Sequence, residues 1–388
     1  MSGNRSSIHL IQSLVFPREG RPHNTENLYW NGGGYRPRND GVALQSGGWL
    51  DFFSYVNLFN ADKWEKYTTI TRPYLRLRLT GTVRVRVYRH STAARSRLPC
   101  LDQTIPGAGW TDIQVPIASR RAGGLYSVRI DAMDSSLVRE GGWYAGVRGE
   151  NDPLCRIALI ICTFNRETYV KKNLDMLSRH LPAAWNVFIV DNGRNLRREL
   201  TGGYDRRFHF YTNANTGGCG GFTRGLMEAR RHPGKWTHAL LMDDDIEIEP
   251  SVLSRTDSFL RALKPEYRDH FLAGAMLRLD YPTLQHEAGA YWNGIRVRHC
   301  AHNLDLSHPM SVLENERETA RRNIYAAWWY CALPLGKDML ADLPVPLFAN
   351  GDDIEYSIRR AEGVICLNGI FVWHLPFHQK YNPVKQPY

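Results

Sequence analysis

The spacing of hydrophobic and polar positions changes near residue 150. Before that point apolar and polar residues alternate, most clearly where Leu75, Leu77 and Leu79 share one face of residues 74–90 and a turn containing Gly81 is expected to reverse the chain. Gly-rich breaks such as NGGG at 31–34 separate further short strand candidates. Many short alternating segments are typical of a sandwich, so we predict a jelly-roll-like β-sandwich over residues 1–150.

From about residue 153 the pattern becomes that of an α/β domain. Residues 155–164, CRIALIICTF, form a continuous apolar stretch of the kind buried on both faces of a parallel sheet. Residues 169–181 have helical spacing, and 185–193 read as the next strand. We predict a Rossmann-like, mostly parallel sheet over residues 151–388, whose ligands bind beyond the carboxyl ends of the strands.

Composition narrows the choice of compartment and partner. No apolar run approaches the roughly 20 residues of a membrane span, and the N-terminus lacks a signal-peptide core, so we expect a cytoplasmic protein. The seven cysteines are scattered and suggest neither a disulfide framework nor a zinc site. The net charge of +10 suits an anionic partner. Because the basic residues are dispersed, nucleic acid is disfavoured against a phosphorylated substrate or an anionic membrane surface.

Three consecutive aspartates, Asp243, Asp244 and Asp245, follow the apolar strand HALLM. Carboxylates at the mouth of such a strand are unfavourable unless they are paired or bind a metal. In extended chain Asp243 and Asp245 lie on one side, and their hard oxygen ligands suit Mn²⁺ or Mg²⁺, which usually also bind substrate phosphates. The alternative is a solvated loop, which the position at a carboxyl strand end disfavours.

Two further stretches are candidates for an anionic ligand. NTGGCGGFTRG at 215–225 opens a helix, and its glycines allow close backbone approach with helix N–H groups free to meet an anion. Its spacing is neither that of a dinucleotide fingerprint nor that of a P-loop, and a flexible turn is an equal alternative. Arg166 follows a strand and is either a diphosphate contact or a surface residue.

The C-terminal half adds a second acidic pair, a histidine and a set of aromatic residues. Asp352 and Asp353 enter an amphipathic helix, where acidic residues are also ordinary caps. His374 follows an apolar strand and gains a role as third metal ligand only together with the aspartates. The aromatic residues at 291–292 and 325–330 are either core or surfaces for sugar rings.

The order of the motifs TFNR, VDNG, NxGGxGGF, DDD, EAG, WWY, DD and WH is specific when taken together. It resembles the galactofuranosyltransferases of glycosyltransferase family 2 that polymerise bacterial galactan, in which a β-sandwich precedes a GT-A domain. The resemblance covers nearly the whole chain. It implies inverting, metal-dependent transfer of galactofuranose from UDP-galactofuranose to a glycan or lipid-linked acceptor during bacterial surface-polysaccharide synthesis.

The same resemblance assigns roles to individual residues. It makes Asp353 the general base with Asp352 orienting the acceptor, and it makes Mn²⁺ or Mg²⁺ the cofactor. The implied metal ligands are Asp243, Asp245 and His374. The implied donor-binding residues are Arg166, Asp191, Asn192, Asn215, Gly217, Gly218 and Asp244. The implied acceptor-binding residues are Glu287, Trp292, Tyr325, Trp328 and Trp329.

Several alternatives stay open at this level. The fold can serve another UDP- or dTDP-sugar donor, and a non-catalytic glycan-binding protein is a third reading. The polymerising family members carry a long helical C-terminal region that has no counterpart in these 388 residues. Peripheral contact with the inner face of the plasma membrane, a homo-oligomer, the acceptor and the number of sugars added are therefore undecided.

Overall fold

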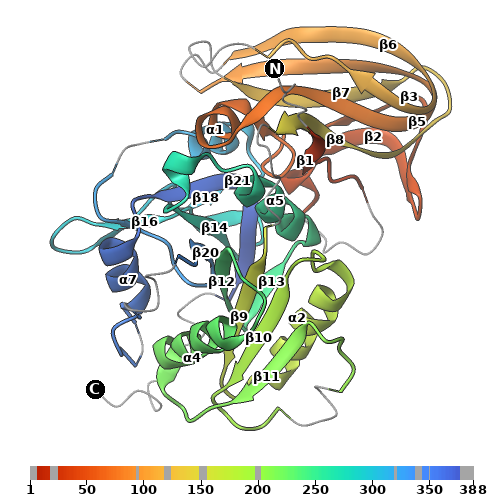
Figure 1. The fold of residues 1–388 in the computed structure, drawn as a ribbon. Helices are drawn as coiled ribbons and strands as arrows, with labels where there is room; N and C mark the ends of the chain where they lie inside the picture. Colours follow the sequence, from red (N-terminus) through yellow and green to blue (C-terminus); the bar gives the residue numbers. More distant parts are fainter. Residues whose placement is uncertain are drawn as a thin grey trace, which may run out of the picture. The chain divides into compact units, whose positions relative to one another are not determined.

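The computed structural model describes residues 7–17, 25–92, 96–117, 124–147, 155–196, 202–318, 321–336, 343–348 and 350–375 (Figure 1). The chain divides into two compact units. The first contains Met1–Pro153, Ser254–Pro265 and Leu304–Thr319, and the second contains Leu154–Leu253, Glu266–Asn303 and Ala320–Tyr388. The first unit thus draws on three stretches of the chain, and the division at residue 150 remains a prediction.

The first unit is the predicted β-sandwich. Its strands are β1 (Ser7–Ser13), β2 (Asn31–Arg38), β3 (Gly41–Asp51), β4 (Phe59–Asn60), β5 (Ile70–Ser91), β6 (Ser96–Ile113), β7 (Leu125–Ala132) and β8 (Ser136–Val147). They are ordered β1-β8-β3-β7-β5-β6, with β2 beside β3 and β4 beside β7. The first half of β5 pairs with β8 and its second half pairs with β7, so this one long strand is hydrogen-bonded to both of them (Figure 1).

The expected alternation along β5 is present, but the expected turn is not. Leu75, Leu77 and Leu79 are all fully buried, as one face of a half-buried strand requires. The strand does not reverse at Gly81; it continues there, paired with Gly107 on β6. Gly81 has a φ angle of +87°, which glycine tolerates. The pairing with β6 continues both before and after Gly81, and so the strand stays extended there.

The later segments of the first unit are fastened to helix α1 (Ala61–Tyr67) by a buried polar cluster. Asn60 caps this helix by accepting a hydrogen bond from the Lys63 backbone N–H, 2.9 Å away. Its side-chain amide also donates to the Glu316 carboxylate at 2.7 Å, and the Lys63 ammonium lies 3.0 Å from the same oxygen. Glu316 follows helix α6 (Pro309–Asn315), so buried charge pairing ties this segment to the sandwich.

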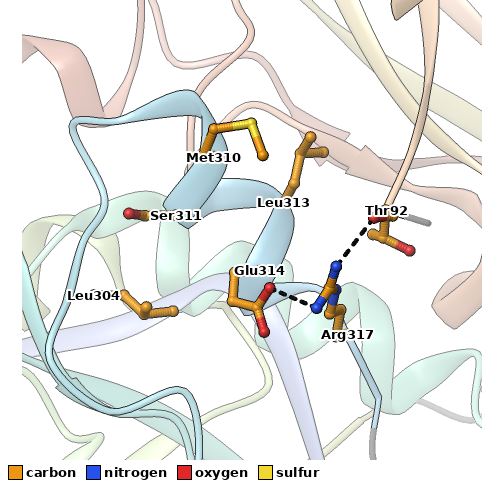
Figure 2. Close-up of a pocket in the computed structure, with 7 residues that line it drawn as sticks. All are labelled: Thr92, Leu304, Met310, Ser311, Leu313, Glu314 and Arg317. Carbon is orange, nitrogen blue, oxygen red and sulfur yellow. Dashed lines mark hydrogen bonds and ion pairs between the residues drawn. The ribbon is translucent and has the colours of Figure 1, made fainter. Parts of the chain in front are cut away.

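A shallow pocket of about 260 Å³ lies in the first unit (Figure 2). Its walls include Met310 and Leu313 from α6, and Arg317 spans it by pairing with Glu314 at 2.9 Å and donating to the Thr92 carbonyl at 3.4 Å. None of the residues that the sequence nominates for chemistry lines this pocket. The candidate chemistry lies entirely in the second unit.

The second unit is built on a mixed sheet with a parallel core, as predicted. Its main strands are β9 (Ile157–Thr163), β10 (Asn186–Asp191), β11 (Phe208–Thr212), β12 (His238–Asp243), β13 (Ile246–Ile248), β14 (Phe271–Arg278), β15 (Leu284–Glu287), β20 (Tyr330–Pro334) and β21 (Val364–His374). The order is β11-β10-β9-β12-β20-β14-β15, with β21 beside β14 and β13 beside β21. Strands β9 to β12 are mutually parallel, whereas β20 is antiparallel to β12.

Helices α2 (Glu167–His180) and α4 (Gly217–Arg231) connect these parallel strands. The crossover through α2 moves from β9 to β10, and the crossover through α4 moves from β11 to β12, in the opposite direction across the sheet. Right-handed crossovers of opposite direction place their helices on opposite faces of the sheet. Helix α4 packs on β9 and β10, and both faces of the parallel core are thereby covered (Figure 1).

The remaining elements of the second unit are short. A small antiparallel sheet contains β17 (Val297–His299), β16 (Ala290–Trp292) and β19 (Ile324–Tyr325), in that order, and helix α7 (Asp352–Arg360) precedes β21. Among the residues that the structure describes, no helix is long and apolar enough to cross a membrane.

Candidate functional site

The candidate site begins at the carboxyl ends of the parallel strands. In register, Thr163 at the end of β9 pairs with Asp191 at the end of β10, and Cys162 pairs with Asp243 at the end of β12. The loops that follow these three strands therefore start side by side. This is the edge at which open α/β sheets bind ligands.

His374 reaches this edge because of the pairing of β13 with β21. Strand β13 begins directly after the aspartates, and its first residue, Ile246, pairs with His374 at the end of β21. The imidazole Nε2 lies 3.4 Å from a carboxylate oxygen of Asp243 and 3.4 Å from one of Asp245. The three side chains thus offer ligand atoms that all lie within 4.8 Å of one another.

The tautomer of His374 suits metal binding. Its Nδ1 lies 2.6 Å from the Leu375 carbonyl, to which it donates, so Nε2 is the nitrogen that faces the carboxylates. His374 and Asp245 are almost fully buried, whereas the Asp243 side chain is 34% exposed. Two carboxylates and one imidazole nitrogen, with Asp243 open to solvent, fit a hard divalent cation such as Mn²⁺ or Mg²⁺.

Arg166 supplies positive charge next to the aspartates. Its guanidinium lies 3.2 Å from Asp244 and also pairs with Asp245. Burial raises the pKa of Asp244 to about 6, although the nearby Arg166 charge acts in the opposite direction. Asp245 thus has one carboxylate oxygen near Arg166 and the other near His374, and Asp244 pairs with Arg166.

Asp191 and Asn192 hold the loops around the site in shape. The two oxygens of Asp191 accept hydrogen bonds from the backbone N–H groups of Gly193 at 3.0 Å and Leu196 at 2.9 Å. The Asn192 side chain donates to the Gly217 carbonyl at 2.9 Å and so joins the end of β10 to the start of α4. Both side chains are buried, and their proposed contact with the donor remains a prediction.

The Gly-rich stretch forms the first two turns of α4, where its glycines allow close packing. A Cβ at Gly217, whose φ is +72°, would lie 1.8 Å from the Phe348 carbonyl oxygen, and one at Gly221 would lie 2.0 Å from Cys162 Sγ. Gly218 instead faces open space. Asn215 accepts a hydrogen bond from the Gly217 N–H at 3.1 Å, which shapes the entry to the helix. Packing therefore explains Gly217 and Gly221, and Gly218 is the position that leaves backbone open to a ligand.

The second acidic pair lies close enough to Asp243 for their charges to interact. Asp352 and Asp353 open helix α7. Burial raises the pKa of Asp353 to about 7, helped by the negative charges of Asp352, Glu287 and Asp243. Burial also raises the pKa of Asp352, and the charge of Asp243 adds to the rise. The start of α7 therefore lies close enough to Asp243, at the end of β12, for their charges to interact, as a shared site requires.

The candidate acceptor residues occupy different environments. Tyr325 on β19 is buried, and its pKa is raised first by burial and then by Glu287 and Asp353. Trp292 at the end of β16 is 36% exposed, which leaves part of its indole available to a ligand. Glu287 is almost fully buried at the end of β15.

The two remaining candidates are tied into the fold. Trp328 belongs to the hydrophobic core, with its ring 5.5 Å from that of Phe222. Trp329 donates its indole N–H to the Gly274 carbonyl at 2.9 Å, and its ring lies 6.2 Å from the His374 imidazole. The position of Trp329 supports the histidine, and the acceptor roles of both tryptophans remain predictions.

One contact of the site was absent from the sequence reasoning. His299 at the end of β17 hydrogen-bonds through Nδ1 to the Glu287 carboxylate, which raises the pKa of the histidine. Twelve residues separate the two, and only the pairing of the small strands reveals that they meet. The spacing of His299 and His302 in RHCAHN was a signal available in the sequence.

Comparison with known families agrees with this geometry. Residues 11–146 match the model described as Galactofuranosyltransferase 2 N-terminal, and residues 158–266 match the model described as Glycosyl transferase family 2. Residues 158–266 therefore contain a glycosyltransferase family 2 domain. The family 2 match includes all but the first residue of β9, the whole of β12 and all three aspartates, and so it contains two of the three proposed metal ligands.

Full-length relatives carry the name of one activity. The chain is 27% identical to galactofuranosyltransferase GlfT2 of Mycolicibacterium smegmatis and 27% identical to that of Mycobacterium tuberculosis; 96% of this chain is covered in both cases. The chain spans 62% of the length of these relatives. The solved structure of S. aureus TarS 1-349 in complex with UDP is 14% identical, with a TM-score of 0.39 over 56% of this chain and 60% of that one.

Proposed function

We propose that this chain is an inverting, metal-dependent glycosyltransferase that moves galactofuranose from UDP-galactofuranose to a glycan or lipid-linked acceptor. The observation that carries the proposal is that a candidate metal-ligand set and a second acidic pair lie close enough for their charges to interact. Asp243, Asp245 and His374 form a ligand set for a hard cation, and Asp353 is a carboxyl group with a pKa of about 7. Transfer from a nucleotide sugar requires one group of each kind.

The ligand set matches the donor half of this reaction. Asp243, Asp245 and His374 would hold a divalent ion, and its positive charge would stabilise a departing diphosphate. Arg166 pairs with Asp244 and Asp245 and its side chain is 36% exposed, so its guanidinium can also reach a diphosphate oxygen. Gly218 leaves open space at the start of α4, where helix N–H groups favour an anion.

The acceptor half depends on Asp353. A carboxylate whose pKa lies near neutrality is a competent general base, because it exists partly as the anion at working pH and still holds a proton well. In the proposed reaction Asp353 takes the proton from an acceptor hydroxyl as that oxygen attacks the anomeric carbon. The single displacement inverts the configuration. Burial raises the pKa of Asp353, and the charges of Asp352 and Glu287 add to the rise. In the proposed reaction Glu287, Tyr325 and Trp292 contact the acceptor.

The identity of the sugar rests on the relatives. Both matched full-length proteins are named galactofuranosyltransferases, and residues 11–146 match a domain model that carries the same name. The carboxylates and imidazole of the metal set recognise a diphosphate whichever sugar it carries. The donor sugar is therefore the part of the proposal that needs its own experiment.

Release of UDP tests the proposal directly. We would supply purified protein with Mn²⁺, a short galactofuranosyl acceptor and either UDP-galactofuranose or UDP-galactopyranose. We expect acceptor-dependent release from the furanose donor that a chelator abolishes. Release from the pyranose donor alone would overturn the assigned sugar, and chelator-resistant release would overturn the metal requirement.

Two variants on helix α7 test the base. Asp353→Asn should abolish transfer while leaving metal-dependent UDP binding intact. Glu355→Gln is the matched control, because Glu355 lies on the same helix and pairs with Arg359 on the protein surface. We expect this control to retain normal turnover. Substantial turnover by Asp353→Asn would show that another group accepts the proton.

The positive charge of the chain supports a membrane-side location for this reaction. Lipid-linked acceptors lie at an anionic surface, which attracts a protein with a net charge of +10. Co-sedimentation with phosphatidylserine-containing vesicles should therefore exceed that with neutral vesicles and should fall as salt is raised. Equal binding to both vesicle types would remove the electrostatic basis of this part of the proposal.

A further inference from the structure

A second cluster of metal-binding side chains lies in the second unit and shares no residue with the proposed metal site. His286 lies on β15, His299 ends β17, and His302 follows three residues later. One ring nitrogen from each lies within 4.8 Å of one from each of the others. Their ring centroids are 4.7 to 5.2 Å apart. Three imidazoles gathered in this way can supply three ligands of a tetrahedral site whose fourth position is open.

Two of the three rings are held in an orientation that suits a metal. His299 Nδ1 bonds to the Glu287 carboxylate, and His302 Nδ1 donates to the His286 carbonyl at 2.7 Å. In each ring Nε2 is therefore the nitrogen left to a ligand. Metal-binding histidines are characteristically oriented by such bonds to a carboxylate or carbonyl.

The backbone around the cluster is cross-linked by hydrogen bonds. Cys300 donates its N–H to the Gly289 carbonyl at 2.8 Å and accepts from the Ala288 N–H at 3.0 Å. The Gln285 side chain donates to the Ala301 carbonyl at 2.8 Å. The segment that carries His299 and His302 is thus fixed against β15. Small side-chain adjustments that keep the two Nδ1 hydrogen bonds would close the remaining distance to a bound ion.

We propose that His286, His299 and His302 bind Zn²⁺, with Glu287 orienting the site from behind His299. Imidazole nitrogens favour Zn²⁺ and related borderline cations, whereas the carboxylate-rich set at Asp243 and Asp245 favours Mn²⁺ or Mg²⁺. The two sites therefore differ in the ion they select. Bound Zn²⁺ joins β15 to the segment after β17 and stabilises this part of the second unit.

The test measures Zn²⁺ binding by the full chain in the presence of excess Mg²⁺. We expect one Zn²⁺ per chain that Mg²⁺ does not displace, a rise in Tm on adding Zn²⁺, and a visible absorption spectrum of tetrahedral Co²⁺ when Co²⁺ is the probe. His302→Ala removes one of the three ligands and should lose all three signals. Because His302 is exposed, the variant should still fold. His299→Gln is a second variant that should lose them as well. Glu287→Gln should weaken Zn²⁺ binding by roughly 10- to 100-fold.

Two controls separate this site from the other metal set and from surface histidines. His308→Ala removes an exposed histidine outside the cluster and should bind Zn²⁺ like the parent chain. Asp243→Asn should lose Mn²⁺-dependent UDP binding but keep the Zn²⁺ signals. The proposal would be overturned if His302→Ala and His308→Ala bound Zn²⁺ equally well. It would also be overturned if Asp243→Asn lost Zn²⁺ binding, or if Mg²⁺ displaced the Zn²⁺.

Discussion

His374 Nε2 lies 3.4 Å from Asp245 Oδ1, and both side chains are almost completely buried. The register of β13 against β21 creates this relationship, because it sets Ile246 opposite His374. Strand β21 lies beside β14 in the same sheet, so the histidine is delivered to the carboxylates by the sheet itself rather than by a loop. A ligand placed on a strand is held more firmly than one placed on a loop.

Replacing His374 should weaken metal binding without unfolding the second unit. We expect His374→Gln to lower the affinity for Mn²⁺ by roughly tenfold or more, which corresponds to about 1.4 kcal/mol. Isothermal titration of Mn²⁺ in the presence of UDP measures the change. Asp243→Asn at the partly exposed ligand should show the same loss without disturbing a buried group. Unchanged Mn²⁺ affinity in both variants would remove these residues from the metal site.

The pH dependence of transfer should report Asp353. The base must be deprotonated to act, so kcat/KM should fall about tenfold per pH unit below an apparent pKa of about 7. Asp352→Asn removes a neighbouring negative charge that raises this pKa. The acid limb of the profile should therefore move to lower pH in that variant. A limb that stays in place would mean that the profile reports a different group.

The glycines of α4 should respond to substitution according to the space around each one. A Cβ at Gly225 would lie 2.2 Å from Ile160 Cγ2 on β9, so Gly225→Ala should destabilise the second unit by about 1–3 kcal/mol despite its better helix propensity. Gly218→Ala is the matched control on the same helix, because nothing lies within 4 Å of its Cβ position. Chemical denaturation of both variants measures the difference. Equal stability would show that α4 does not pack closely on β9.

The buried ion pair of the first unit should be sensitive to the loss of one partner. Lys63→Met leaves the fully buried Glu316 carboxylate without its cation, which we expect to cost about 3–5 kcal/mol of unfolding free energy. Lys66→Met breaks the exposed pair with Glu318 instead and should cost at most about 1 kcal/mol. Guanidinium denaturation distinguishes the two. Similar small losses would mean that the Lys63–Glu316 pair does not hold this segment in place.

Local patterns were sufficient to predict the two fold classes. Alternation along β5 placed Leu75, Leu77 and Leu79 on a buried face, and the apolar run that contains β9 identified a parallel strand. Both signals arise from the period of the element itself, so no partner is needed to read them. The Gly81 turn was predicted wrongly because a glycine permits a turn but does not require one, and pairing with β6 keeps the strand extended.

By itself the sequence determined the fold class of each domain and the carboxylates at the end of β12, because strand period and strand ends are local properties. Tertiary structure alone decided which distant residues join them. Strand register brings His374 to Asp245 and His299 to Glu287, and burial gives Asp353 a pKa near 7. Close packing on β9 also explains Gly221 and Gly225. These relationships depend on distances between segments far apart in the chain, which composition and spacing do not encode.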